Sequence, residues 1–202
     1  MELYYIKPKD EFLIMELLKE AQNSQMNEFC IMFEYEDYLL FKGRTKRKYE
    51  GSDYSLLDIP TADAFWTSGG IGVVSPGSIV IGAFSDSEQT LIDLRTKIYG
   101  ILCTFLEPLN KFTQITKNDV EVDHRKISGC FINKTPQNQF ALGLYVNNVA
   151  PNSLIGKVTT NPTRFGSGLL EFNIDKNDIM NRIQQLFEKT NTEFNIEKIK
   201  RP

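Results

Sequence analysis

Apolar residues recur at helical spacing in three stretches of the chain, and most other stretches carry the shorter patterns of strands. The helical stretches are residues 10–22, 85–105 and 178–189. In each of them the apolar residues gather on one face, as in a helix that covers a core. The second begins with a capping-box pair, Ser85 and Glu88, and Pro108 closes it.

Shorter stretches rich in β-branched and aromatic residues predict strands. Phe29–Phe33 and Tyr38–Phe41 flank a polar segment suited to a hairpin. The glycine-containing stretch 69–82 predicts two strands joined at Ser75–Ser78, and residues 112–147 predict three or four more. Because strands outnumber helices and most neighbours look hairpin-connected, we expect an α+β fold with a mainly antiparallel β-sheet and flanking helices.

Composition narrows the class of protein. The chain has 202 residues, 41% hydrophobic and 24% charged, with a net charge of -3. These values predict a single globular domain over residues 1–202 and give no electrostatic reason to expect nucleic acid as a partner. No stretch approaches the ~20 apolar residues of a membrane span, and the first residues lack a secretory-signal pattern. The three widely spaced cysteines offer no disulfide framework, so we expect a reducing, intracellular (cytoplasmic) setting.

Several widespread catalytic motifs are missing from the sequence. It contains neither a phosphate-binding Gly-x-x-x-x-Gly-Lys-Ser/Thr loop nor a dinucleotide-binding Gly-x-Gly-x-x-Gly turn nor a zinc-binding His-Glu-x-x-His pair. The one histidine, His124, lies in a polar turn, where we expect it to be exposed. A triad or a cysteine–histidine pair would have to use it.

The segment 117–129 carries the most chemical information. Val120 and Val122 alternate with charged residues, Asp123 and His124 make a turn, and Lys126 follows it. A lysine after such a turn, near a small residue and a glycine, can point into a cleft. The alternative from spacing alone is a hairpin whose charges are all solvated.

This segment resembles the signature of biotin- and lipoate-protein ligases. In that family an Asn-Asp pair precedes a hairpin, and a Lys-hydrophobic-small-Gly step follows it. Asn118, Asp119, Lys126 and Gly129 fall on those positions. Three further segments are similar to family motifs in the same order. They are 29–47, which contains a Gly-Arg step; 68–79, with a glycine-rich loop and a Ser75-Pro76-Gly77-Ser78 stretch that resembles the Ser-Pro-x-Gly of biotin ligases; and 142–148, a glycine- and asparagine-containing strand.

The resemblance implies a fold and an activity. Such enzymes join a carboxylate to the α-phosphate of ATP and pass the acyl group to a lysine of a lipoyl- or biotinyl-carrier domain. Lys126 would then be the catalytic cation, Asp119 would hold Mg²⁺, and the acid would be lipoate, octanoate or biotin. The implied acid-binding residues are Ser68, Gly69, Gly70, Gly72, Ser128 and Gly129. The implied nucleotide-binding residues are Arg44, Arg47 and Asn118.

Departures from the family pattern leave an alternative open. Phe65-Trp66 occupy the place of an Arg-Arg pair in active lipoate ligases, and each lost guanidinium bond is worth on the order of 1.5–3 kcal/mol. Either the basic loop 42–48 compensates, or the chain is a catalytically inactive relative that serves as a binding or assembly module. The related octanoyltransferases use a cysteine nucleophile, but the position of Cys130 in the pattern favours a buried strand residue.

Overall fold

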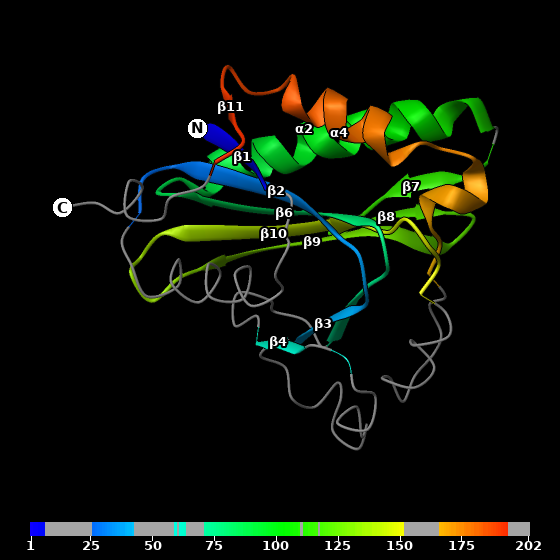
Figure 1. Cartoon of the computed structure of the whole chain (residues 1–202), viewed down its shortest axis with the longest axis horizontal. Helices are drawn as coiled ribbons and strands as arrows, with labels where there is room; N and C mark the ends of the chain where they lie inside the picture. Colours follow the sequence, from blue (N-terminus) through cyan, green and yellow to red (C-terminus); the bar gives the residue numbers. More distant parts are fainter. Residues whose placement is uncertain are drawn as a thin grey trace.

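The structure is a computed structural model that describes residues 1–6, 26–42, 59, 61–63, 71–109, 111–116, 118–151 and 166–193. Its main feature is an eight-stranded sheet with the order β11-β1-β2-β6-β10-β9-β8-β7 (Figure 1). Its strands are β1 (Glu2–Ile6), β2 (Phe29–Tyr35), β6 (Ser78–Ser85), β7 (Thr113–Ile115), β8 (Asp119–Val122), β9 (Arg125–Lys134), β10 (Phe140–Val146) and β11 (Thr190–Asn191). Only β1 has parallel neighbours, and the other pairs are antiparallel. The expected α+β class with a mainly antiparallel sheet is confirmed.

A second sheet has three strands and the order β4-β3-β5. They are β4 (Thr61–Asp63), β3 (Leu39–Lys42) and β5 (Ile71–Val74). The predicted hairpin between the strands near 29 and 41 is therefore wrong, because β2 and β3 lie in different sheets. The prediction of two strands joined at Ser75–Ser78 is confirmed by β5 and β6, which lie in different sheets.

The two sheets are connected by one bent ribbon. β2 pairs with β6 up to Tyr35–Ser78, and β3 pairs with β5 from Leu39–Val74 onward, in one unbroken antiparallel register. At the bend, Gly77 has a φ of 72° and donates its N–H to the carbonyl of Tyr35 (2.6 Å). A residue with a Cβ is strained at that φ, which accounts for the glycine.

Helices α2 (Glu88–Leu106) and α4 (Lys176–Gln184) lie over one face of the large sheet, whereas β3 and β4 lie on its other side (Figure 1). The short 3-10 helices η3 (Glu107–Leu109) and η4 (Leu169–Phe172) follow α2 and precede α4. The buried side chains of α2 are Leu91, Leu94, Ile98, Tyr99, Leu102 and Leu106. This face carries the larger apolar core, which also includes Val120, Val146 and Ile179.

The two described helices differ from the predicted ones at their ends. Ser87, not Ser85, caps α2 by accepting the N–H of Thr90 at 3.3 Å. Ser85 instead accepts the N–H of Ser87 at 3.0 Å. α4 begins at Lys176 after the cap Asp175 and ends at Gln184, five residues short of the predicted end. The predicted helix at 10–22 lies outside the described residues. None of the described helices is long and apolar enough to cross a membrane.

A second apolar cluster lies on the sheet face away from the helices. Alternate residues of β2, β6 and β10 point to this face, as the period of two in a strand requires. The cluster contains Phe29, Ile31, Phe33, Val80, Phe84, Ala141 and Tyr145, together with Leu39 and Val74 of the small sheet. The small sheet therefore packs against this face through its own apolar residues.

Burial at the sheet–helix interface predicts a stability difference between two leucines. Leu102 of α2 is fully buried, whereas Leu170 of η4 is 59% exposed. Leu102→Ala should lower the free energy of unfolding by about 2–5 kcal/mol, because it leaves a cavity in the core. Leu170→Ala should change it by less than about 0.5 kcal/mol. Urea unfolding followed by circular dichroism measures both, and equal losses would contradict the assigned packing.

Candidate functional site

A β-bulge between β8 and β9 positions Lys126. The register is Val120 opposite Ser128 but Glu121 opposite Lys126, so β9 has one extra residue at this point. Without the bulge, Lys126 and Gly129 would point to opposite faces of the sheet, because they are an odd number of residues apart. The extra residue places both on the face away from the helices, where Asp119 pairs with Gly129. The turn before β9 uses the positive φ angles of Asp123 (48°) and His124 (62°), as predicted for these two residues.

The Lys126 ammonium is held by two partners on this face. Its Nζ lies 2.7 Å from Oδ1 of Asp119, and the side chains are 29% and 14% exposed. Its Nζ also lies 5.5 Å from the centroid of the Tyr145 ring. Burial lowers the pKa of Lys126, but Tyr145 and the Asp119 carboxylate raise it by more, so the pKa lies above the ordinary lysine value. The ammonium is therefore charged at neutral pH.

Two aromatic rings cross over two glycines beside the lysine. Gly129 of β9 faces Tyr145 of β10, and Gly143 of β10 faces Phe131 of β9. A Cβ on Gly129 would lie 2.7 Å from Nζ of Lys126 and 2.8 Å from Cζ of Tyr145. A Cβ on Gly143 would lie 2.2 Å from the Phe131 ring. Both glycines are thus required by close approach of a side chain from the neighbouring strand.

An apolar pocket lies next to this pair of rings. Its floor contains Gly82 of β6, which is the register partner of Gly143. The side chains around it are those of Phe33, Val80, Phe84, Phe131, Ala141 and Tyr145. Among the described residues that line it, the Tyr145 hydroxyl is the one polar side-chain group. Tyr145 therefore borders both the apolar pocket and the lysine ammonium.

The segment 166–172 is hydrogen-bonded to the backbone of the strands that carry Lys126 and Tyr145. The N–H of Ser167 donates to the Lys126 carbonyl (2.8 Å), and the N–H of Leu169 donates to the carbonyl of Asn147, just after β10 (2.9 Å). A Cβ on Gly168 would lie 2.5 Å from the backbone of Val149, so only glycine permits this approach.

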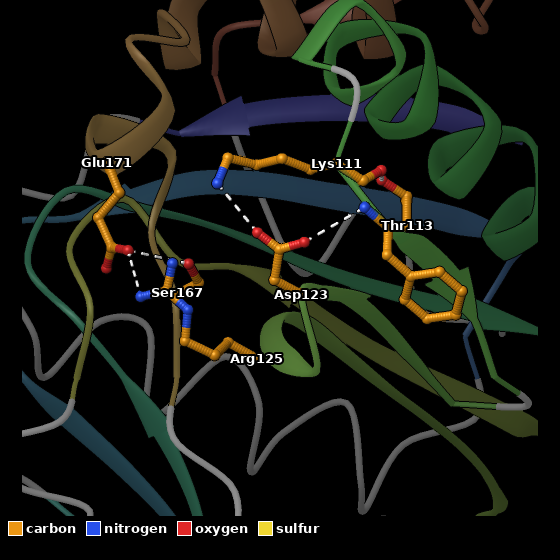
Figure 2. A network of polar contacts seen from close by, with 7 residues as sticks. Lys111, Thr113, Asp123, Arg125, Ser167 and Glu171 are labelled. Atoms are coloured by element: carbon orange, nitrogen blue, oxygen red, sulfur yellow. Dashed lines mark hydrogen bonds and ion pairs between the residues drawn. The ribbon is translucent and has the colours of Figure 1, made fainter.

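Ion pairs on both sides of the Asp123–His124 turn also hold this part of the sheet in place (Figure 2). Arg125 Nη1 lies 2.6 Å from Oε2 of Glu171, which also accepts from the hydroxyl of Ser167 (3.2 Å). On the other side of the turn, Lys111 lies 2.9 Å from Asp123 and lowers the pKa of that carboxyl through a hydrogen bond. The residue immediately before Lys126 is thereby tied to the segment 166–172, and the turn to residue 111 (Figure 2).

The structure brings some of the predicted site residues together and not others. Lys126, Asp119 and Gly129 meet at one place. The Asn118 carbonyl accepts from the N–H of Cys130 (2.6 Å) and the hydroxyl of Tyr99 (2.7 Å), which fixes the chain just before Asp119. Ser128 is fully buried on the helix-facing side and donates to the Tyr145 carbonyl (2.6 Å), so its hydroxyl does not reach the Lys126 face.

The other predicted residues either lie in the small sheet or fall outside the described residues. Gly72 lies in β5 of the small sheet, opposite Phe41. The residues that lie outside the described ranges are Arg44, Arg47, Ser68, Gly69 and Gly70. Sequence reasoning missed Tyr145, Phe131 and Gly82. The available signal was a glycine inside each of two apolar strands, which often marks a close approach.

Two further expectations concern Cys130 and His124. Cys130 is a buried strand residue on β9, as expected, and burial raises the pKa of its thiol to about 12. The neutral thiol is a poor nucleophile. His124 is exposed in the turn and stacks near Phe112, with ring centroids 5.1 Å apart.

The Mg²⁺ implied for Asp119 has a limited set of ligands in this structure. The described residues contain no group of three His, Cys, Asp or Glu side chains that could hold a metal ion. Mg²⁺ is commonly held by one or two carboxylates together with substrate phosphates and water. A lone carboxylate beside the Lys126 ammonium is compatible with that mode of binding.

Comparison with known proteins identifies the fold. No family profile and no curated protein matches the sequence. Among solved structures, LipL1 of P. falciparum in complex with lipoate aligns with a TM-score of 0.67 at 13% identity, over 91% of this chain and 58% of that one. A bipartite lipoate protein ligase from Thermoplasma acidophilum, described with its E2 lipoyl domain, aligns with a TM-score of 0.67 at 13% identity. The alignment covers 98% of this chain and 88% of that one. A lipoate-protein ligase A bound with ATP aligns with a TM-score of 0.68 at 12% identity, over 98% of this chain and 90% of that one. The chain therefore has the fold of lipoate-protein ligases, and it spans less than two thirds of the P. falciparum protein.

The ion pair at the site predicts a titration shift. In Asp119→Asn the pKa of Lys126 should fall, because burial still disfavours the ammonium while the opposing charge is gone. NMR titration of the chain with ¹³C-labelled lysine measures this value, and the exposed Asp93→Asn on α2 is the control. A pKa that stays the same or rises in Asp119→Asn would contradict the assigned pair.

The same pair predicts how stability changes at high pH. A pKa raised by folding stabilises the native chain below the ordinary lysine value of 10.5, and this contribution is lost as the pH rises through the raised value. The difference in unfolding free energy between wild type and Asp119→Asn should therefore shrink above pH 10.5.

Proposed function

We propose that this chain is a lipoate-protein-ligase-like enzyme that activates an apolar monocarboxylic acid as its adenylate and transfers the acyl group to a lysine of a carrier domain. The observation that carries the proposal is the position of the Lys126 ammonium, 5.5 Å from the ring of Tyr145, which itself lines the apolar pocket. An acid bound with its chain in the pocket would direct its carboxylate toward Lys126. The fold likeness supports the same activity.

The chemistry of this proposal requires a fixed cation. Joining a carboxylate to the α-phosphate of ATP brings two anions together, and charge grows on the oxygens between them. A preorganised ammonium stabilises that charge, because its position is already set by the ion pair with Asp119. Asp119 would hold Mg²⁺ on the phosphate oxygens, and Asn118, Arg44 and Arg47 remain the proposed nucleotide contacts.

Lipoate or octanoate fits the pocket better than biotin. The described lining is apolar apart from the Tyr145 hydroxyl at the lysine end. The ureido ring of biotin carries N–H and C=O groups, each of which costs about 1–3 kcal/mol when buried without a partner. The hydrocarbon chain of octanoate and the dithiolane of lipoate carry no such groups, so they can occupy this pocket without that cost.

The proposed acceptor is a lipoyl-type carrier domain, since the archaeal ligase with the same fold is described with its E2 lipoyl domain. The second candidate function is a binding or assembly module without catalysis. The replacement of an arginine pair by Phe65-Trp66 favours it, because the nucleotide site then lacks two guanidinium groups. The two candidates differ in whether pyrophosphate exchange occurs at all.

Removal of Lys126 tests the catalytic proposal. Lys126→Ala should lower acid-dependent ATP–pyrophosphate exchange by ~10²–10³ or more, because the cation at the developing charge is lost. Lys126→Arg should also fail, since a planar guanidinium cannot replace a compact ammonium against Gly129. Lys134→Ala, at the far exposed end of β9, is the matched control and should keep full activity. Exchange at the wild-type rate in Lys126→Ala would refute the assignment, and no exchange in wild type with any of the three acids would favour the inactive module.

Ligand preference gives a second test. Calorimetric titration of the full chain should give affinities for lipoate and octanoate at least about tenfold higher than for biotin, because of the unpaired ureido groups. Equal or tighter binding of biotin would contradict the assignment of the apolar pocket as the acid site.

A further inference from the structure

One residue touches both halves of the proposed site. Tyr145 lines the apolar pocket, and the centroid of its ring lies 5.5 Å from the Lys126 ammonium. The residue is 7% exposed and is fixed in the middle of the sheet, where β10 pairs with β6 on one side and β9 on the other. Its position is therefore set by backbone pairing on both edges.

The orientation of the ring follows from the absence of a side chain at Gly129. The point where a Cβ of Gly129 would lie is 2.8 Å from Cζ of Tyr145 and 2.7 Å from Nζ of Lys126. The hydroxyl-bearing end of the ring and the ammonium thus meet over the same glycine. Phe131 lies over Gly143 in the opposite sense, and both rings line the apolar pocket.

We propose that Tyr145 is a specificity-determining residue, which ends the acyl pocket with its ring and binds the substrate carboxylate with its hydroxyl. The proposal rests on the proposed function, because it uses the same pocket and the same acid. A tyrosine hydroxyl next to an ammonium has a hydrogen to donate, and a carboxylate oxygen is an acceptor. Lys126 and Tyr145 then form a two-point site that a neutral head group satisfies poorly.

Two substitutions separate the hydroxyl from the ring. Tyr145→Phe keeps the ring and removes the hydroxyl, so octanoate should bind about tenfold or more weakly, as expected for a lost bond to a charged group. Octanamide, which has the same chain and no charge, should be affected by less than about threefold. Tyr145→Leu removes the ring together with the hydroxyl, so octanamide should also bind more weakly to it than to Tyr145→Phe.

The experiment is calorimetric titration of the full chain with octanoate and octanamide, without ATP. Tyr4→Phe, on β1, is the matched control and should bind both as wild type does. Thermal unfolding of each variant checks that the fold is retained, and the near-isosteric Tyr145→Phe keeps the test valid if Tyr145→Leu does not fold.

The outcomes distinguish this proposal from the proposed function. Weaker octanoate binding in Tyr145→Phe with octanamide binding retained supports the role of Tyr145, whether or not pyrophosphate exchange occurs. Unchanged octanoate binding in Tyr145→Phe overturns that role, even where wild type catalyses exchange. Equal losses for octanoate and octanamide, or a wild-type chain that binds neither, also overturn it.

Discussion

The ion pair between Lys126 and Asp119 is the interaction on which the candidate site depends. An ammonium that lies against an apolar sheet face loses water, and this loss disfavours its charge unless an anion replaces the solvent. Asp119 supplies that anion from the neighbouring strand, and the bulge in β9 brings the lysine to its side. The bonds from Ser167 and Asn118 then hold the backbone at each partner, so the pair is part of the sheet and not a contact between two mobile side chains.

The two glycines of the site are needed because side chains from the neighbouring strand lie directly over them. In an antiparallel sheet, directly opposed side chains share a face, and one large residue can occupy the space of its partner only if that partner is glycine. Tyr145 and Phe131 use this space in opposite directions across β9 and β10. The Lys126 ammonium therefore lies over Gly129, and the Phe131 ring lies over Gly143. The two glycines belong to neighbouring cross-strand pairs on the same face of the sheet. A polar head and an apolar chain can thus be bound side by side without any rearrangement of the sheet.

Local pattern was sufficient to predict parts of this arrangement. The turn at Asp123–His124, the buried faces of Val120 and Val122, and the burial of Cys130 all follow from alternation along one or two strands. The bulge at Lys126 could not be predicted, because it is a mismatch between two strands and leaves no mark in either. The hairpin predicted at 29–41 was wrong for a similar reason: both edges of β2 are taken by β1 and β6, so the chain bends into the second sheet. Tyr145 was missed because alternation gives its face but not its cross-strand partner.

The ion pair between Lys126 and Asp119 also determines how much positive charge the site can offer to a substrate. With Asp119 beside it, Lys126 contributes little net positive charge to the site, so an incoming carboxylate or phosphate competes with Asp119 for the ammonium. That competition is favourable only if another cation takes the place of Lys126 at Asp119, since an uncompensated half-buried carboxylate is costly. Active members of the family that the sequence resembles carry two arginines just before their glycine-rich loop, and Phe65-Trp66 occupy that place in this sequence. In the proposed function, the positive charge needed for nucleotide binding would have to come from a metal ion at Asp119 or from the basic run 42–48. If neither supplied it, an acid would bind only weakly, through the Tyr145 hydroxyl and the ammonium hydrogens that Asp119 leaves open, and it would not be adenylated.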